Sequence, residues 1–143
     1  MKKVYLLDTN IVSEFSKEDP NLNVVAFYEA RKDLCAISAI TWQELVYGCV
    51  KMPEGKRKNY VLSCLELIKQ NFEIISYDDY SANICGTLLA KLKMKGKSLP
   101  YSDTQIASNA IANGMILVTH NVKDFCDIKE RSFLRVEDWF EEA

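Results

Sequence analysis

Long apolar stretches are missing from this 143-residue chain. No run approaches the roughly 18 apolar residues that a membrane-spanning helix needs. The apolar segment 4–7 is interrupted at Asp8, whereas a secretory signal needs an apolar region of about 7–15 residues. We therefore expect a cytoplasmic protein that has no membrane contact.

Thiol and imidazole ligands for metals are also scarce. The five cysteines are odd in number and lack CxxC spacing, and His120 is the only histidine, with Cys126 as its one nearby cysteine. This pattern does not favour a zinc site. It favours reduced cysteines that are mostly buried in the core.

A strong charge of one sign is missing too, since the formal net charge is −2. The molecule as a whole therefore does not attract nucleic acid, and any contact with RNA requires a local basic patch. Hydrophobic residues make up 48% and charged residues 27% of the chain, which is typical of a globular protein. The length fits a single domain over 1–143, without repeats or a linker.

What the sequence does contain is an alternation of short apolar runs with stretches of helical periodicity. The predicted strands are 3–7, 34–38, 73–77, 115–119 and 134–136. The predicted helices are 21–31, 41–51, 56–69, 80–95 and 102–113, the last two being followed by glycine. Such alternation predicts βαβ units. The expected fold is therefore α/β, a three-layer α/β/α sandwich around a parallel sheet of four to five strands.

Acidic and amide residues lie near the ends of several predicted strands. Asp8 follows the first strand directly, and Glu44 comes six residues after the second. Asp103 opens the helix that leads to the fourth strand, and Asn121 and Asp124 follow that strand. Because ligands of open parallel sheets bind beyond the carboxyl ends of the strands, we expect these residues to meet at one edge.

A cluster of carboxylates in one pocket requires a compensating cation. Ligands that are all oxygen point to Mg²⁺, for which Mn²⁺ can substitute. Such an ion can lower the pKa of a bound water and neutralise a phosphate during an in-line displacement. The sequence thus predicts metal-dependent phosphodiester hydrolysis, with Asp8, Glu44 and Asp103 as metal ligands and catalytic residues and with Asp124 as a further acid near the same edge.

Two of these acids also fit a purely structural role. Glu44 comes three residues after Thr41, which is the spacing of a helix capping box. Asp103 lies within a second such box, from Ser102 to Gln105, where an acid in the first helical turn is favourable. Neither acid by itself therefore decides between a cap and a metal ligand.

The other polar candidates have alternatives as well. Asp8 can cap a helix that starts near Asn10, and Asp124 can be an ordinary surface acid. His120 is interpreted as a surface or RNA-contacting residue, since metal-bound water needs no histidine base. The lysines at the end of the helix over 80–95 either interact with the helix dipole or contact RNA phosphates. These lysines are Lys91, Lys93, Lys95 and Lys97.

Taken together, these segments resemble the PIN-domain family, and within it the VapC-type toxins of bacterial toxin–antitoxin pairs. The similar segments follow one another in order over nearly the whole chain. They are LDTNI at 7–11, ISAITWQELVYG at 37–48, DTQIA at 103–107, LVTHNVKDF at 117–125 and LRVEDW at 134–139.

The resemblance implies an endoribonuclease that acts on structured RNA such as tRNA. It also implies a homodimer and a small antitoxin partner that blocks the site. Asp8, Glu44 and Asp103 match three family acids, whereas the fourth falls at Asn121 or, as in some members, at Asp124. Supporting polar positions of the metal site are matched by Asn10, Thr119 and Asn121. For RNA contact we consider Lys91, Lys95, Lys97 and His120.

Two alternatives remain at this point. A haloacid-dehalogenase-like phosphotransferase also carries an aspartate after its first strand, but it expects a second acid where this chain has Asn10, and Lys123 is a poor match for its lysine. A catalytically weak PIN-like module that binds RNA or protein is the other alternative. Weak metal binding by the purified protein would favour that module.

Overall fold

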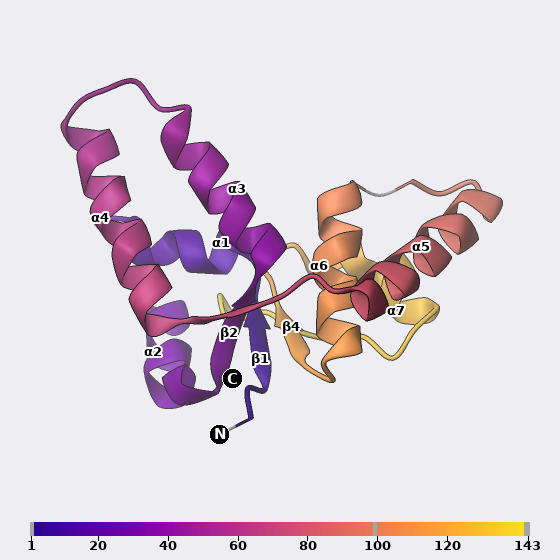
Figure 1. The fold of residues 1–143 in the computed structure, drawn as a ribbon. Helices are drawn as coiled ribbons and strands as arrows, with labels where there is room; N and C mark the ends of the chain where they lie inside the picture. The colour runs from indigo at the N-terminus through magenta and orange to yellow at the C-terminus, as the bar shows by residue number, and fades with distance from the viewer. Residues whose placement is uncertain (1, 99, 142–143) are drawn as a thin grey trace.

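A five-stranded parallel sheet flanked by helices forms the centre of the computed structural model, which describes residues 2–98 and 100–141 (Figure 1). The strands are β1 (Tyr5–Leu7), β2 (Cys35–Ser38), β3 (Glu73–Ile75), β4 (Ile116–Val118) and β5 (Arg135–Glu137). Their order is β3-β2-β1-β4-β5, and every neighbouring pair is parallel. The predicted α/β class is confirmed, and each strand begins and ends within two residues of its prediction.

The helices connect these strands. They are α1 (Thr9–Val12), α2 (Leu22–Arg31), α3 (Ala39–Val50), α4 (Lys56–Asn71), α5 (Asp79–Met94), α6 (Tyr101–Ala112) and α7 (Cys126–Glu130). Short 3-10 turns are η1 (Ser13–Ser16), η2 (Lys32–Leu34) and η3 (Val122–Phe125). The glycine stops are confirmed at Gly96 and Gly114, whose positive φ values of 71° and 63° follow the ends of α5 and α6. Helix α7 was not predicted from the sequence.

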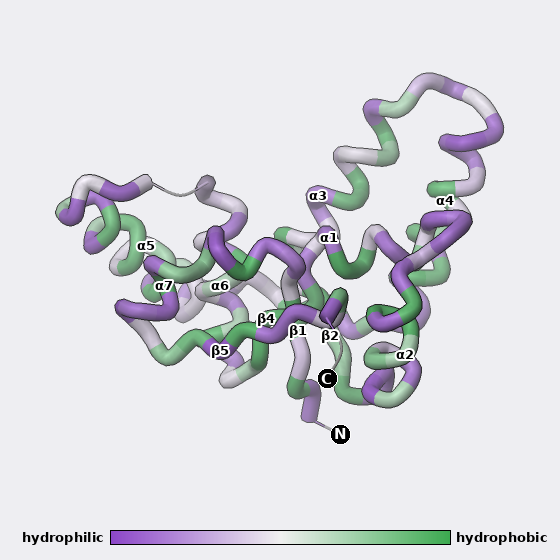
Figure 2. The backbone as a smooth tube through the Cα atoms, turned by 180° about the vertical axis from the view of Figure 1, so that it is seen from behind, coloured by the Kyte–Doolittle hydropathy of each residue, from purple (hydrophilic) through white to green (hydrophobic). Residues whose placement is uncertain are grey.

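Two apolar clusters cover the two faces of the sheet. Successive strand residues point to opposite faces, so Leu6 and Leu117 pack with α5, α6 and α7, while Leu7 and Val118 pack with α1 to α4 and Trp139. Hydrophobic and hydrophilic residues accordingly alternate along the flanking helices (Figure 2). Burying one large apolar side chain contributes about 1.5–3 kcal/mol, so both layers hold the strand ends firmly.

Two helical pairs extend beyond the carboxyl edge of the sheet (Figure 1). The α3–α4 pair rises on one side and the α5–α6 pair on the other. None of the described helices is both long enough and apolar enough to cross a membrane. Of the five cysteines, all unpaired, Cys35, Cys49 and Cys85 are buried, whereas Cys126 is exposed.

Candidate active site

Asp8 lies at the carboxyl end of the central strand and is only 5% exposed. Its backbone N–H donates to the carbonyl of Val118 at 2.8 Å, which fixes it beside the end of β4. Its carboxylate accepts hydrogen bonds from the Thr9 N–H (2.8 Å), the Thr119 hydroxyl (2.8 Å) and the Asn10 amide (3.3 Å). Asp8 is therefore the N-cap of α1 and the centre of a polar cluster at the same time.

The electrostatics of Asp8 reflect both burial and hydrogen bonding. Burial raises the pKa of its carboxyl above the usual value, and the nearby Glu44 carboxylate raises it further. Hydrogen bonds from Thr119, Thr9 and Asn10 lower the pKa of Asp8 in return. Burial therefore disfavours the ionised form of Asp8, and the hydrogen-bond donors of the site favour it.

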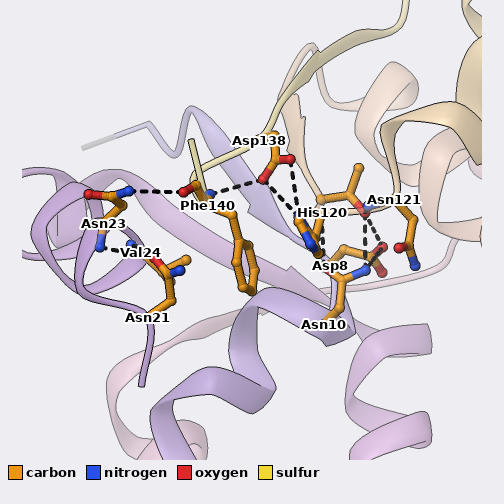
Figure 3. Close-up of polar contacts among 10 residues, drawn as sticks. Asp8, Asn10, Asn21, Asn23, Val24, His120, Asn121, Asp138 and Phe140 are labelled. Carbon is orange, nitrogen blue, oxygen red and sulfur yellow. Dashed lines mark hydrogen bonds and ion pairs between the residues drawn. The ribbon is translucent and has the colours of Figure 1, made fainter. Parts of the chain in front are cut away.

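The predicted supporting residues meet around the buried hydroxyl of Thr119. This hydroxyl accepts from the Asn10 amide at 3.2 Å and from the Asn121 backbone N–H at 3.1 Å, while it donates to Asp8. The Asn10 side-chain oxygen in turn accepts from the His120 backbone N–H at 3.0 Å (Figure 3). Residues from the ends of two neighbouring strands are therefore linked into one network.

Glu44 reaches the site from α3. Its carboxylate accepts from the Thr9 hydroxyl at 2.7 Å, a contact that the sequence analysis missed although Thr9 stands inside the LDTNI segment. The predicted capping box with Thr41 is wrong because α3 begins earlier, with Ser38 as its N-cap accepting from the Ile40 N–H at 3.1 Å. The position of Glu44 is thus free of any capping role.

Asp103 stands in the first turn of α6. The second predicted capping box is also wrong: α6 begins at Tyr101, and its N-cap, Pro100, makes no side-chain capping bond. Desolvation raises the pKa of Asp103 to about 6, and the negative charges of Asp8, Glu44 and Asp124 add to this rise. The fold therefore brings Asp103 within electrostatic reach of the other three acids.

The region after β4 contributes Asn121 and Asp124. Asp124 lies in η3, and its backbone N–H donates to the Asn121 carbonyl at 3.0 Å. The negative charge of Asp124 contributes to the raised pKa of Asp103, whereas Asn121 carries no charge. Of the two residues considered for the fourth acidic position, Asp124 is the one that adds to the negative potential.

The donor set at this edge suits a hard divalent cation, because every candidate ligand is an oxygen. Neighbouring carboxylates disfavour each other's ionised form, and a cation bound between them removes this repulsion. Within residues 2–98 and 100–141, however, no three acidic, cysteine or histidine side chains already converge into a complete cation site. The chemistry of the donors therefore fits a metal, while the side-chain geometry is not yet that of a closed coordination shell.

The remaining predicted residues are the lysines at the end of α5 and His120 in the loop after β4. Lys91 and Lys95 are exposed at the end of α5, and Lys97 forms an ion pair with Asp127 at 3.1 Å. The side chain of His120 is 50% exposed, and its Nδ1 lies 3.1 Å from Asp138. This contact between Asp138 and His120 was not predicted from the sequence.

The chain matches a known domain family over most of its length. Residues 5–131 match the PIN domain. The chain therefore belongs to the PIN-domain family. This match excludes the haloacid-dehalogenase alternative.

Individual relatives define the branch of that family. Ribonuclease VapC2 of Haemophilus influenzae is 32% identical over 136 residues, which are 94% of this chain and 97% of the relative. The tRNA(fMet)-specific endonuclease VapC of Shigella flexneri is 30% identical over 135 residues, with the same coverage. The crystal structure of VapBC2 from Rickettsia felis, bound to a DNA fragment, contains a chain that superposes with a TM-score of 0.81 at 32% identity, covering 95% of this chain and 98% of that chain. These similarities place the protein among the VapC-type toxin ribonucleases.

Proposed function

We propose that this VapC-type ribonuclease is a Mg²⁺-dependent endoribonuclease that cleaves structured RNA such as tRNA. The observation that carries the proposal is the gathering of four acids at one sheet edge, where burial raises the pKa of Asp103 to about 6 and the charges of Asp8, Glu44 and Asp124 add to this rise. Four carboxylates near one another are unfavourable without a cation. The tRNA(fMet)-specific relative from S. flexneri supports the substrate class.

In this proposal the metal ligands and catalytic residues are Asp8, Glu44, Asp103 and Asp124, and Mn²⁺ can replace Mg²⁺. The bound ion supplies a water of lowered pKa and neutralises the phosphate. Asn10 and Thr119 orient the carboxylate of Asp8, and the Asn121 N–H fixes Thr119. The hydroxyl of Thr9 holds Glu44. These hydrogen bonds prepare the first two acids before RNA arrives.

RNA contacts near the site are proposed for the end of α5 and for the loop after β4. Lys91 and Lys95 are exposed there and can contact phosphates, whereas Lys97 first has to leave Asp127. The half-exposed ring of His120 lies beside the acidic edge, by which we mean the carboxyl edge of the sheet with the four acids Asp8, Glu44, Asp103 and Asp124. The proposed place of action is the cytoplasm, where such RNA is found.

A small antitoxin is the proposed protein partner, alongside a second copy of this chain in a homodimer. The structural relative from R. felis is a VapBC2 assembly, and this likeness supports an antitoxin. An acidic pocket is blocked well by an arginine, because its fork pairs with carboxylates at two points. We expect the antitoxin to direct an arginine or lysine towards Asp8 and Asp103.

The test of the nuclease proposal is metal-dependent cleavage of total cellular RNA. Asp103→Asn and Asp8→Asn should each abolish cleavage, because each removes a ligand charge while keeping the side-chain shape. Asp79→Asn is the matched control, since Asp79 is a first-turn acid of α5 outside the acidic edge and should keep full activity. Wild-type cleavage by Asp103→Asn would refute the mechanism. Absence of Mg²⁺-dependent cleavage by the unmodified protein would favour the catalytically weak binding module.

A further inference from the structure

The tip of the α3–α4 hairpin carries a concentration of positive charge. Residues 51–58 contain four cations and one acid, a net charge of +3. The whole chain has a formal charge of −2, so the remaining residues together carry −5. The start of α4 is accordingly hydrophilic in Figure 2. On an otherwise acidic protein, such a segment is the local basic patch that contact with RNA requires.

The hairpin tip is held in shape by its own contacts. The ammonium of Lys58 binds Glu54 at 2.9 Å and the carbonyl of Val50 at 3.1 Å, which closes the turn between the helices. Lys58 is therefore committed to the structure. In contrast, no ion pair within residues 2–98 and 100–141 engages the other three cations, which are Lys51, Lys56 and Arg57.

Two of these free cations are positioned over tyrosine rings. The Lys51 ammonium lies 4.8 Å from the ring centre of Tyr47, and the Arg57 guanidinium lies 5.6 Å from that of Tyr60. These tyrosines are 66% and 47% exposed. Cations ordered in this way lose less side-chain freedom on binding phosphate, and exposed rings can stack with unpaired bases.

The position of the hairpin connects this surface to the acidic edge. Lys51 is the C-cap of α3 and follows Glu44 by seven residues, which is two helical turns, or about 10 Å along the axis. Residues at this spacing lie on one helix face. The α3–α4 hairpin rises from the sheet edge opposite the α5–α6 pair (Figure 1). An RNA strand at Glu44 can therefore continue along α3 to the hairpin tip.

We propose that the α3–α4 hairpin tip is an RNA-binding surface in addition to the α5 lysines. Lys51, Lys56 and Arg57 contact phosphates, and Tyr47 and Tyr60 stack with unpaired bases. This assignment rests on the proposed ribonuclease function. It adds a place where the substrate is held at a distance from the acids.

The experiment measures binding of unfractionated tRNA, with Asp103→Asn present in every protein so that RNA is not cut. The double variant Lys56→Gln/Arg57→Gln should bind more weakly, and the slope of log K against log salt should shrink by about 1.4, at roughly 0.7 per lost contact. The control is Lys2→Gln/Lys32→Gln, which removes the same charge at the amino edge of the sheet. That control should retain the affinity and slope of the Asp103→Asn parent.

Three results would overturn the assignment. The first is an unchanged salt slope in the hairpin variant while the parent binds tRNA, which leaves the nuclease proposal intact. The second is normal tRNA binding with lost antitoxin binding, which makes the hairpin a protein-docking surface. The third is absence of tRNA binding by the parent itself, which removes this assignment and tRNA as the substrate, while metal-dependent cleavage of total cellular RNA remains the test of the nuclease proposal.

The C-terminal residues Asp138 and Phe140 contact His120 in the loop after β4, and we call this group of contacts the clasp. The ring of Phe140 stacks on that of His120 with 3.9 Å between centroids. Asp138 lies 3.1 Å from Nδ1 of His120 and accepts from the Phe140 N–H at 2.9 Å. The amide of Asn23 in α2 donates to the Phe140 carbonyl at 2.9 Å (Figure 3). His120 is thus held by two side chains from the end of the chain.

Hydrogen bonds connect the clasp to the acidic site. The backbone N–H of His120 donates to Asn10, and the Asn10 amide then donates to Asp8 and Thr119. With its oxygen fixed by His120, the Asn10 amide presents its NH₂ group to Asp8. The geometry points to Asp138 and Phe140 as positioning residues, which act on Asp8 through His120 and Asn10.

The fold does not depend on Phe140 alone, because Trp139 is the C-terminal anchor. Trp139 is 1% exposed, stacks with Phe27 at 5.6 Å and donates to Glu137 at 3.0 Å. Phe140→Leu should therefore keep the melting temperature within a few degrees. Its kcat should fall about tenfold with little change in KM, because only the orientation of catalytic groups is affected.

A second readout does not depend on activity. His120 is the single histidine, so its ring protons are identifiable by NMR, and Phe140→Leu should remove the ring-current shift that Phe140 imposes on them. Phe140→Tyr keeps an aromatic ring and should restore both kcat and the shift. Phe133→Leu is the control, since Phe133 is 96% exposed. A lost ring-current shift with unchanged kcat would reduce the clasp to a structural contact and overturn the assignment.

Discussion

Asp8 shows how one side chain serves the fold and the site together. Its carboxylate caps α1 through the Thr9 N–H and also accepts from Thr119 and Asn10. A cap and a metal ligand are therefore not exclusive alternatives at this residue. The Thr9 N–H that caps α1 also favours the ionised form of the buried Asp8 carboxylate, as do the donors of Thr119 and Asn10.

Asp103 leads to a prediction about stability and pH. The pKa of Asp103 is raised from 3.8 to about 6 in the folded protein. Between these two pH values the carboxyl is mostly protonated in the folded state and mostly ionised in the unfolded state. Stability should therefore fall as pH rises from about 4 to 6, and remain lower above that. In metal-free buffer, Asp103→Asn should be more stable than the wild type by roughly 1–2 kcal/mol at pH 7.

The measurement is urea unfolding with a chelator at pH 4 and pH 7. At pH 4 the folded wild type is almost fully protonated at Asp103 and the unfolded chain is partly protonated, so most of the advantage of the Asn variant should disappear. Adding Mg²⁺ at pH 7 should stabilise the wild type more than the variant. Equal unfolding free energies of the two proteins at pH 7 would contradict the inferred electrostatic strain.

At the scale of elements, the start of α3 decides what Glu44 is available to do. Ser38 caps the helix from the last residue of β2, and this moves Thr41 and Glu44 one turn inward. Thr41 is fully buried, and its hydroxyl has no hydrogen-bond partner among the described residues. Ser38 is therefore the residue that caps α3. Glu44 takes no part in the cap, and its carboxylate accepts the hydrogen bond from the Thr9 hydroxyl.

This arrangement predicts opposite effects for two hydroxyl residues. Ser38→Ala should lower the free energy of unfolding by about 0.5–2 kcal/mol, because it removes the cap. Thr41→Val should be neutral or stabilising by about 1 kcal/mol, because it removes a buried hydroxyl that has no partner. Thermal or urea unfolding of both variants measures these changes. A larger loss from Thr41→Val than from Ser38→Ala would restore the capping box with Glu44.

At the scale of the whole molecule, the acidic edge lies between two helical pairs. The α3–α4 pair brings Glu44 and the basic hairpin tip, and the α5–α6 pair brings Asp103 and the α5 lysines (Figure 1). Negative charge thus gathers where the cation is proposed, and positive charge gathers farther out. This separation suits a polyanionic substrate that approaches a carboxylate site.

A growth experiment tests the proposed cellular role. Strong expression of the protein alone should arrest growth, and co-expression of the small protein produced beside it should restore growth. Asp103→Asn should be harmless alone, because the arrest is attributed to RNA cleavage. Normal growth during expression of soluble, active wild-type protein would refute the toxin role while leaving the nuclease proposal in place.

Most of the fold was determined by local sequence. Apolar runs of strand length and helical periodicity predicted the five strands and the helices α2 to α6, because both patterns depend on residues close in sequence. The placement of polar residues after β1 and β4 predicted a site at one sheet edge. In contrast, α7 was not predicted because its five residues, Cys126–Glu130, are too few to show a period.

Only the tertiary structure decided how the site is assembled. The Thr9–Glu44 hydrogen bond joins residues 35 apart in sequence, and the His120–Asp138 contact joins residues 18 apart. The pairing of Lys97 with Asp127 likewise depends on where α7 packs. Such contacts follow from the relative placement of layers and not from any local pattern. The sequence by itself therefore determined which chemistry gathers at the edge, and packing decided which side chain holds which.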